Sequence, residues 1–191
     1  IFKSFILIRF VFLIFVIDTL FYNKVLTLKK FFLSSLLCTS FVSLDIIFQY
    51  IFGFDIFGMK NNGRYNSGPF GDELIAGGYL QKFSFFSFFY IFHVYKNKNL
   101  SNPIIYFVIA LHSLAIALSG NRMPLLLFFF GCALLIILFK RIRIAISIGL
   151  TIFIIIFLFI LVNDKNIKVP YQNFYLQTIS PILTNDSSIK S

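Results

Sequence analysis

No charged residue interrupts residues 144–162, which read IAISIGLTIFIIIFLFILV. A bilayer core about 30 Å thick is crossed by roughly 20 predominantly apolar residues in a helix, so this stretch predicts a membrane-spanning helix. Further apolar windows precede it between short polar breaks, at residues 5–22, 31–53, 74–95, 104–119 and 125–139. The sequence therefore predicts an all-α, polytopic membrane protein with about six transmembrane helices.

Composition supports a membrane class and argues against other classes. Of the 191 residues, 59% are hydrophobic, whereas soluble domains have about 45–50% apolar residues. The net charge of +10 would suit a nucleic-acid-binding protein, but Lys and Arg fall mainly in the short breaks, where they set membrane orientation. We therefore expect no nucleic-acid partner. Cys38 and Cys132 lie inside apolar windows, which favours small core residues over a disulfide or a metal site.

The charges of the breaks predict a topology. Basic breaks belong on the cytoplasmic side and occur at residues 22–30, 96–103 and 140–143. The breaks at 54–73 and 120–124, and the tail from residue 163, then face outward. We interpret residues 1–162 as a transmembrane region that is part of a larger domain. Residues 163–191 begin an extracytoplasmic loop, and both ends of the chain read as cuts.

The outward break continues into the start of the third span, where residues 63–80 read GRYNSGPFGDELIAGGYL. Its Gly and Pro residues favour tight turns and positive backbone dihedrals. Asp72 and Glu73 precede the predicted helix, where acidic groups suit the positive helix end. They are either helix caps or accessory groups of a site.

The second outward break is the turn Ser119-Gly120-Asn121-Arg122-Met123-Pro124. Asn121 is a predicted helix cap, and Pro124 is predicted in the first turn of the fifth span. Arg122 would then lie at a helix N-terminus at the membrane surface, an arrangement that suits a phosphate or diphosphate. The alternative is an arginine that reaches toward lipid headgroups.

These two breaks together resemble the O-antigen ligase and O-antigen polymerase superfamily of bacterial envelope glycan assembly. The 63–80 stretch is similar to the family's Arg, Gly-x-Phe-Gly and Ala-x-x-Leu pattern, and residues 119–122 are similar to its Ser-Gly-x-Arg turn. Residues 45–57 also resemble the family. Where the family usually has Asn-Pro-Asn, this chain has Asp72-Glu73.

The resemblance implies a GT-C-like, metal-independent glycosyltransferase without cofactors, acting at the periplasmic face of the bacterial inner membrane in lipopolysaccharide biosynthesis. The donor would be a glycan on undecaprenyl diphosphate, and the acceptor lipid A core in ligases or a carrier-linked repeat in polymerases. Matched onto this chain, the arginines that hold the diphosphate are Arg122 and Arg64, with Asp72 and Glu73 as accessory candidates. The family's catalytic His lies on a later loop and has no counterpart here, so the catalytic residue is unknown.

Two other functions stay open. A transporter or flippase of lipid-linked saccharides would use polar groups inside the apolar windows, and an accessory subunit would have no site. Polar residues inside or close to these windows are functional candidates by default; they are Arg9, Asp18, Asp45, Lys82 and His112. We expect His112 to face the helix bundle and His93 to be interfacial.

Overall fold

The computed structural model of the chain describes residues 15–23, 27–60, 65–71, 73–94, 103–140 and 142–163. Its elements are α2 (Leu28–Phe52), a 3₁₀ turn η1 (Gly68–Phe70), α3 (Ala76–Val94), α4 (Pro103–Leu118), α5 (Arg122–Leu138) and α6 (Arg143–Asn163). Residues 15–22 are also helical. Within these ranges the one β interaction is an isolated bridge between Phe54 and Lys60. The predicted all-α class is confirmed.

Helices α2 to α6 coincide with predicted apolar windows to within a few residues. Local signals explain their ends. Thr27 caps α2 by accepting a hydrogen bond from the Lys30 amide at 3.4 Å, and Gly53 ends it with a φ of 81°, which costs glycine little. The first predicted window is helical from residue 15, and its earlier residues lie outside the described ranges.

The prediction of six transmembrane spans is not matched by helix length and composition. Of the described helices, α2 and α6 are long and apolar enough to cross a membrane. Helices α4 and α5 are apolar but have 16 and 17 residues, which corresponds to roughly 24–26 Å. In α3, Gln81, Lys82 and several Ser residues dilute the apolar character. The structure thus supports membrane association through two helices.

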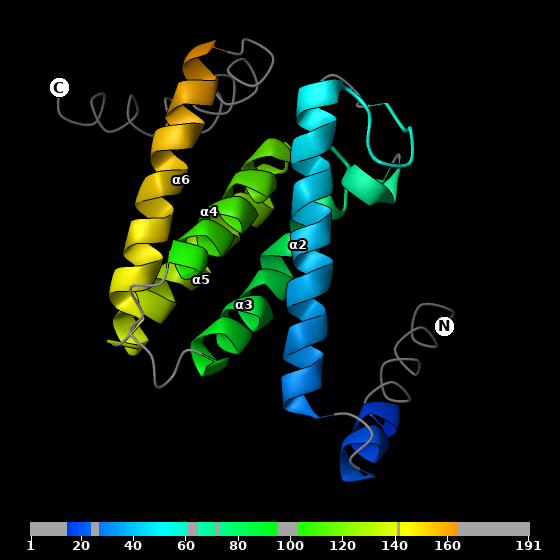
Figure 1. Cartoon of the computed structure of the whole chain (residues 1–191), viewed down its shortest axis with the longest axis vertical. Coiled ribbons are helices and arrows are strands. Elements are labelled where there is room, and N and C mark those ends of the chain that lie inside the picture. The colour runs from blue at the N-terminus through cyan, green and yellow to red at the C-terminus, as the bar shows by residue number, and fades with distance from the viewer. Residues whose placement is uncertain are drawn as a thin grey trace, which may run out of the picture.

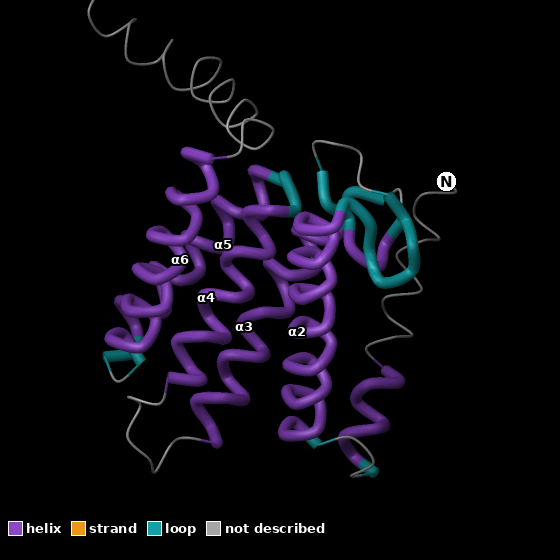
Figure 2. Tube along the Cα trace, turned by 45° about the horizontal axis from the view of Figure 1, so that its top comes forward, coloured by secondary structure: helices purple, strands orange, loops and turns teal. Residues whose placement is uncertain are grey.

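The helices run up and down the bundle, so successive connections lie at opposite ends. Figure 1 shows α2 and α6 flanking α3, α4 and α5. Helix α2 packs on α3 and α4, and α6 packs on α4 and α5. The α2–α3 loop and the α4–α5 turn lie at one end of the bundle, and the α5–α6 turn lies at the other (Figure 2). The two predicted outward breaks therefore share an end.

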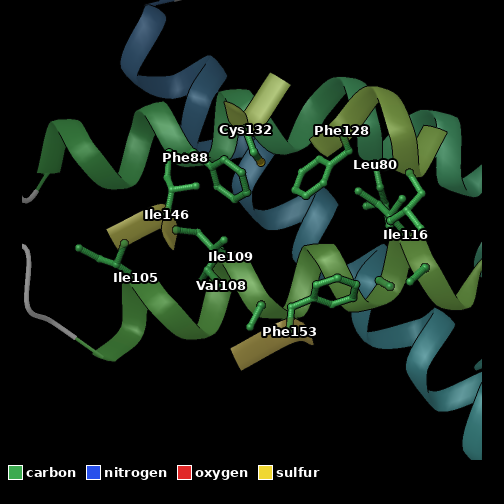
Figure 3. Close-up of a cluster of buried hydrophobic side chains, with 14 of the residues drawn as sticks. Leu80, Phe88, Ile105, Val108, Ile109, Ile116, Phe128, Cys132, Ile146 and Phe153 are labelled. Atoms are coloured by element: carbon green, nitrogen blue, oxygen red, sulfur yellow. The ribbon is translucent and has the colours of Figure 1, made fainter. Parts of the chain in front are cut away.

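The core is an apolar layer between α3, α4, α5 and α6. Figure 3 shows Phe88 and Phe128 in this layer, with ring centroids 6.2 Å apart in an edge-on arrangement. Gly149 lets α6 approach α4 closely, because a Cβ atom there would lie 2.7 Å from Cβ of Ile109. Cys132 is buried in this core as predicted, whereas Cys38 is exposed on α2, so the prediction of a core position was wrong for Cys38.

Candidate functional site

The α4–α5 turn places Arg122 at the first residue of α5. Helix α4 ends at Leu118, where the Ser119 amide donates to the Ala115 carbonyl at 2.9 Å and the Gly120 amide to the Ala117 carbonyl at 3.2 Å. Gly120 then reverses the chain with a φ of 77°, a conformation that favours glycine. Pro124 follows in the first turn of α5, as predicted. Arg122 therefore lies at a helix N-terminus.

Asn121 occupies the N-cap position of α5, but its side chain makes no capping hydrogen bond. Its Nδ2 instead donates to the Leu74 carbonyl at 2.8 Å, in the segment that leads into α3. The predicted N-cap position of Asn121 is therefore confirmed, but its side chain ties the two predicted outward breaks together and does not cap the helix. The Asn121 side chain makes no capping bond to the first turn of α5, and a helix N-terminus favours anions.

Helix α3 presses directly against this turn at Gly77. A Cβ atom on Gly77 would lie 2.5 Å from Oγ of Ser119 and 3.0 Å from Cβ of Asn121. Ser119 is itself fixed, since its hydroxyl donates to the Ile116 carbonyl at 2.7 Å. The position of Arg122 is thus set by contacts on both sides of the turn.

Two adjoining hollows open around the turn. One, of about 290 Å³, is lined by Tyr65, Gly120, Asn121, Arg122, Met123 and Pro124. The other, of about 500 Å³, lies between the start of α3 and the start of α5 and is lined by Leu74, Ile75, Gly78, Tyr79, Lys82, Phe83, Asn121 and Pro124. Asn121 and Pro124 form the shared wall. Among the described lining residues, each hollow has one basic side chain, Arg122 in the first and Lys82 in the second.

The predictions for the other candidate site residues, Arg64, Asp72 and Glu73, differ in how they compare with the structure. Arg64 and Asp72 lie outside the described residues, whereas Tyr65, next to Arg64, lines the hollow of Arg122. Glu73 is exposed and precedes α3, which has no acidic residue in its first turn. The capping interpretation of Glu73 was therefore wrong. Its amide donates to the Phe70 carbonyl at 3.3 Å, within the turn after η1.

The α2–α3 loop is fixed to the bundle by buried amide side chains. Nδ2 of Asn66 donates to the Leu118 carbonyl at the end of α4, at 2.7 Å. Gln49 on α2 accepts from the Gly68 amide at 2.9 Å and donates to the Met59 carbonyl at 3.3 Å. These bonds bring Tyr65 beside the turn. Sequence reasoning identified neither Asn66 nor Gln49 as a tie, since nothing local to either residue shows its distant partner.

A second polar cluster lies inside the bundle and includes His112. The Thr39 hydroxyl donates to the Ser35 carbonyl at 2.7 Å, and its oxygen is also hydrogen-bonded to Ser87 Oγ at 2.7 Å and to His112 Nε2 at 2.8 Å. All three side chains of this tie are fully buried. Because they come from α2, α3 and α4, the cluster joins three helices at one point. His112 faces the bundle, as expected.

We predict that Thr39→Val weakens the bundle, because it leaves His112 Nε2 and the Ser87 hydroxyl without their shared partner. Such bonds between helices in a membrane contribute roughly 0.6–2 kcal/mol. Thr151→Val is the matched control, since the Thr151 hydroxyl bonds within α6, to the Ser147 carbonyl, at an exposed position. Heat denaturation of the detergent-purified protein measures the melting temperature of both variants. Equal melting temperatures for the two variants would contradict the tie.

The remaining polar candidates lie away from the Arg122 turn or outside the described ranges. His93 is exposed and lines a hollow of about 320 Å³ with Lys29 and Tyr90, between α2 and α3. Asp18 is exposed, and Arg9 lies outside the described ranges. Sequence reasoning marked Lys82 for its charge within an apolar window, but its place beside the turn depends on how α3 packs against α5.

Comparison of the chain with protein-family models, curated proteins and solved structures finds no match.

Proposed function

We propose that this chain is part of a multi-pass membrane glycosyltransferase of the O-antigen ligase type. It would take a glycan from an undecaprenyl diphosphate carrier and transfer it to a lipid-linked acceptor on the periplasmic face of the inner membrane. The observation that carries this proposal is the pair of adjoining hollows, in which Arg122 and Lys82 lie on either side of the Asn121–Pro124 wall. A site that binds an amphiphilic anion needs both cationic side chains for its charge and an apolar surface for its lipid part.

Arg122 supplies the first part of the proposed chemistry. Cleavage of a sugar–phosphate bond leaves negative charge on the diphosphate, and a fixed guanidinium stabilises that charge where it develops. The planar guanidinium can also hold two phosphate oxygens at once. The N-terminus of α5, where Arg122 lies, adds to the same field. Arg64 is proposed as a second contact, supported by the position of its neighbour Tyr65 in this hollow.

The larger hollow supplies the apolar surface of the proposed donor site. Leu74, Ile75, Tyr79 and Phe83 line it on α3 and the segment before it, and they suit the first isoprene units of the carrier. Lys82 is exposed on α3, inside an apolar window where an unpaired charge is costly. A phosphate at the head of the carrier would offset that cost. This arrangement supports binding of a lipid-linked anion more directly than binding of a soluble sugar.

A transporter that uses intramembrane polar groups has less support. His112 Nε2 is held in the Thr39 tie and Oδ1 of Asp45 accepts the Ile56 amide at 2.9 Å, so one polar atom of each residue has a structural partner. Neither residue lines the two hollows beside Arg122. The polymerase of the same superfamily shares the proposed donor site, and the acceptor distinguishes it from the ligase. Transfer assays with lipid A core and with a carrier-linked repeat as acceptors would separate the two.

We expect Lys82→Met to raise KM for the lipid-linked donor about 10-fold with a smaller change in kcat, because the lysine contributes to donor binding. Lys82→Arg should retain most of the affinity. Lys140→Met is the matched control, since Lys140 is exposed after the end of α5, at the opposite end of the bundle. The measurement is the initial rate of glycan transfer against donor concentration in detergent or liposomes. An unchanged KM for Lys82→Met would remove the larger hollow from the donor site.

A further inference from the structure

Two carboxylates are enclosed where the α2–α3 loop covers α2. Asp45 lies on α2 and Asp55 on the loop just after it, and neither side chain has any exposed surface. Oδ1 of Asp45 accepts the Ile56 amide at 2.9 Å, and Oδ1 of Asp55 accepts the Met59 amide at 2.6 Å. The Asp45 carboxylate therefore lies against the backbone of Asp55–Ile56, and the charge of Asp55 repels that of Asp45.

The second oxygen of each carboxylate has no hydrogen-bond partner. Oδ2 of Asp45 and Oδ2 of Asp55 are both buried and unpaired. An uncompensated buried charge costs several kcal/mol, and here two of them lie together. The pair therefore needs a positive charge or a proton.

Among the residues that the structure describes, the groups beside the pair do not supply this compensation. The side-chain amide of Gln49 is already engaged, since its two ends bond Gly68 and Met59. Lys60, the nearest basic residue along the described loop, is exposed at the surface. The loop backbone packs closely against α2 at Gly68, because a Cβ atom there would lie 2.9 Å from Cγ1 of Ile46 and 3.6 Å from Oδ2 of Asp45. Backbone thus passes close to the unpaired oxygen without a side chain.

We propose that Asp45 and Asp55 bind a hard divalent cation, Ca²⁺ or Mg²⁺, that fastens the α2–α3 loop to α2. Carboxylate oxygens are the ligands these ions prefer, and backbone carbonyls and water complete their coordination. No group of three or more His, Cys, Asp and Glu side chains that could hold a metal occurs in the described part of the chain. The described residues therefore provide two carboxylates, whose hard oxygens suit Ca²⁺ or Mg²⁺ better than Zn²⁺, which is bound mainly by Cys and His. The ion is structural and independent of the proposed glycan transfer.

The test is the thermal stability of the purified chain after treatment with EDTA. Adding CaCl₂ or MgCl₂ at constant pH and ionic strength should raise the melting temperature by about 5 °C, whereas NaCl should not. Asp45→Asn and Asp55→Asn should each abolish this shift, because each removes one of the two charges and preserves the side-chain shape. Asp18→Asn is the matched control, since Asp18 is exposed and remote in sequence, and it should retain the shift.

Equilibrium dialysis of the unmodified chain with ⁴⁵Ca²⁺, and with Mg²⁺ as competitor, keeps the proposal testable if the asparagine variants do not fold. A single bound divalent ion per chain supports the site. If no ion binds, the proposal is overturned. If acid stabilises the chain and a cation does not, the two carboxylates share a proton, which also overturns the proposal. A cation shift that persists in both asparagine variants would also overturn it.

Discussion

Replacing Arg122 with alanine is expected to lower kcat/KM for glycan transfer about 100-fold, with the protein still folded. The loss follows from the position of Arg122 at the first residue of α5, because one fixed donor to a developing oxyanion contributes a rate factor of about 10²–10³. The turn itself is held by Asn121, Ser119 and Gly77, so the alanine variant should keep its shape. The measurement is transfer of a labelled glycan from a lipid-linked donor by cells or membranes that express the intact reading frame.

Arg122→Lys provides the conservative comparison. Lysine keeps the charge but cannot hold two phosphate oxygens with one planar group, so we expect intermediate activity. Arg143→Ala is the matched control at the first residue of α6, at the other end of the bundle, and it should transfer glycan at the normal rate. Full activity in Arg122→Ala would contradict the assignment of the diphosphate to this turn.

The second large effect is expected from Gly77→Ala. The new methyl group would meet Oγ of Ser119 at 2.5 Å and Cβ of Asn121 at 3.0 Å, so α3 and the turn must move apart. Overpacking of this kind costs about 1–3 kcal/mol. A displacement near 1 Å at a catalytic group can reduce a rate about 100-fold. We therefore expect a lower melting temperature together with a strong loss of transfer.

Gly78→Ala is the control for this prediction, because a Cβ atom on Gly78 has no neighbour within 4 Å. Alanine is also favoured over glycine in a helix, so this variant should be as stable as the unmodified protein or slightly more stable. The two variants are compared by heat denaturation, because Gly78 lines the larger hollow and its variant is a control for stability only. If Gly77→Ala and Gly78→Ala behaved alike, the close contact between α3 and the turn would not control the position of Arg122.

The sequence predicts the helices well because their signals are local. The uninterrupted apolar stretch at residues 144–162 becomes α6, and Gly53 and Gly120 end helices through positive φ values. The number of membrane spans was harder to predict, since length and polarity separate α2 and α6 from α3, α4 and α5. An apolar window shows that a helix is hidden from water, but it does not show whether lipid or protein covers it.

The site could be predicted only in part. Arg122 at a helix N-terminus follows from the Gly120 and Pro124 signals around it. Side-chain capping by Asn121 and Glu73 was wrong because it was judged from neighbours in sequence, whereas the Asn121 side chain bonds Leu74 across the bundle end. Lys82 joins the site through the packing of α3 against α5, and no local pattern contains that information.

The measurement that tests the account most directly is the sidedness of the α4–α5 turn in intact cells. The native Cys38 and Cys132 would first be replaced, because both are free thiols. Met123→Cys reports on the turn and Phe139→Cys on the opposite end, at residues that are 65% and 48% exposed. A maleimide that cannot cross membranes should label Met123→Cys in intact cells and Phe139→Cys only after permeabilisation. Labelling of Phe139→Cys alone in intact cells would place Arg122 on the cytoplasmic side and contradict the proposed site.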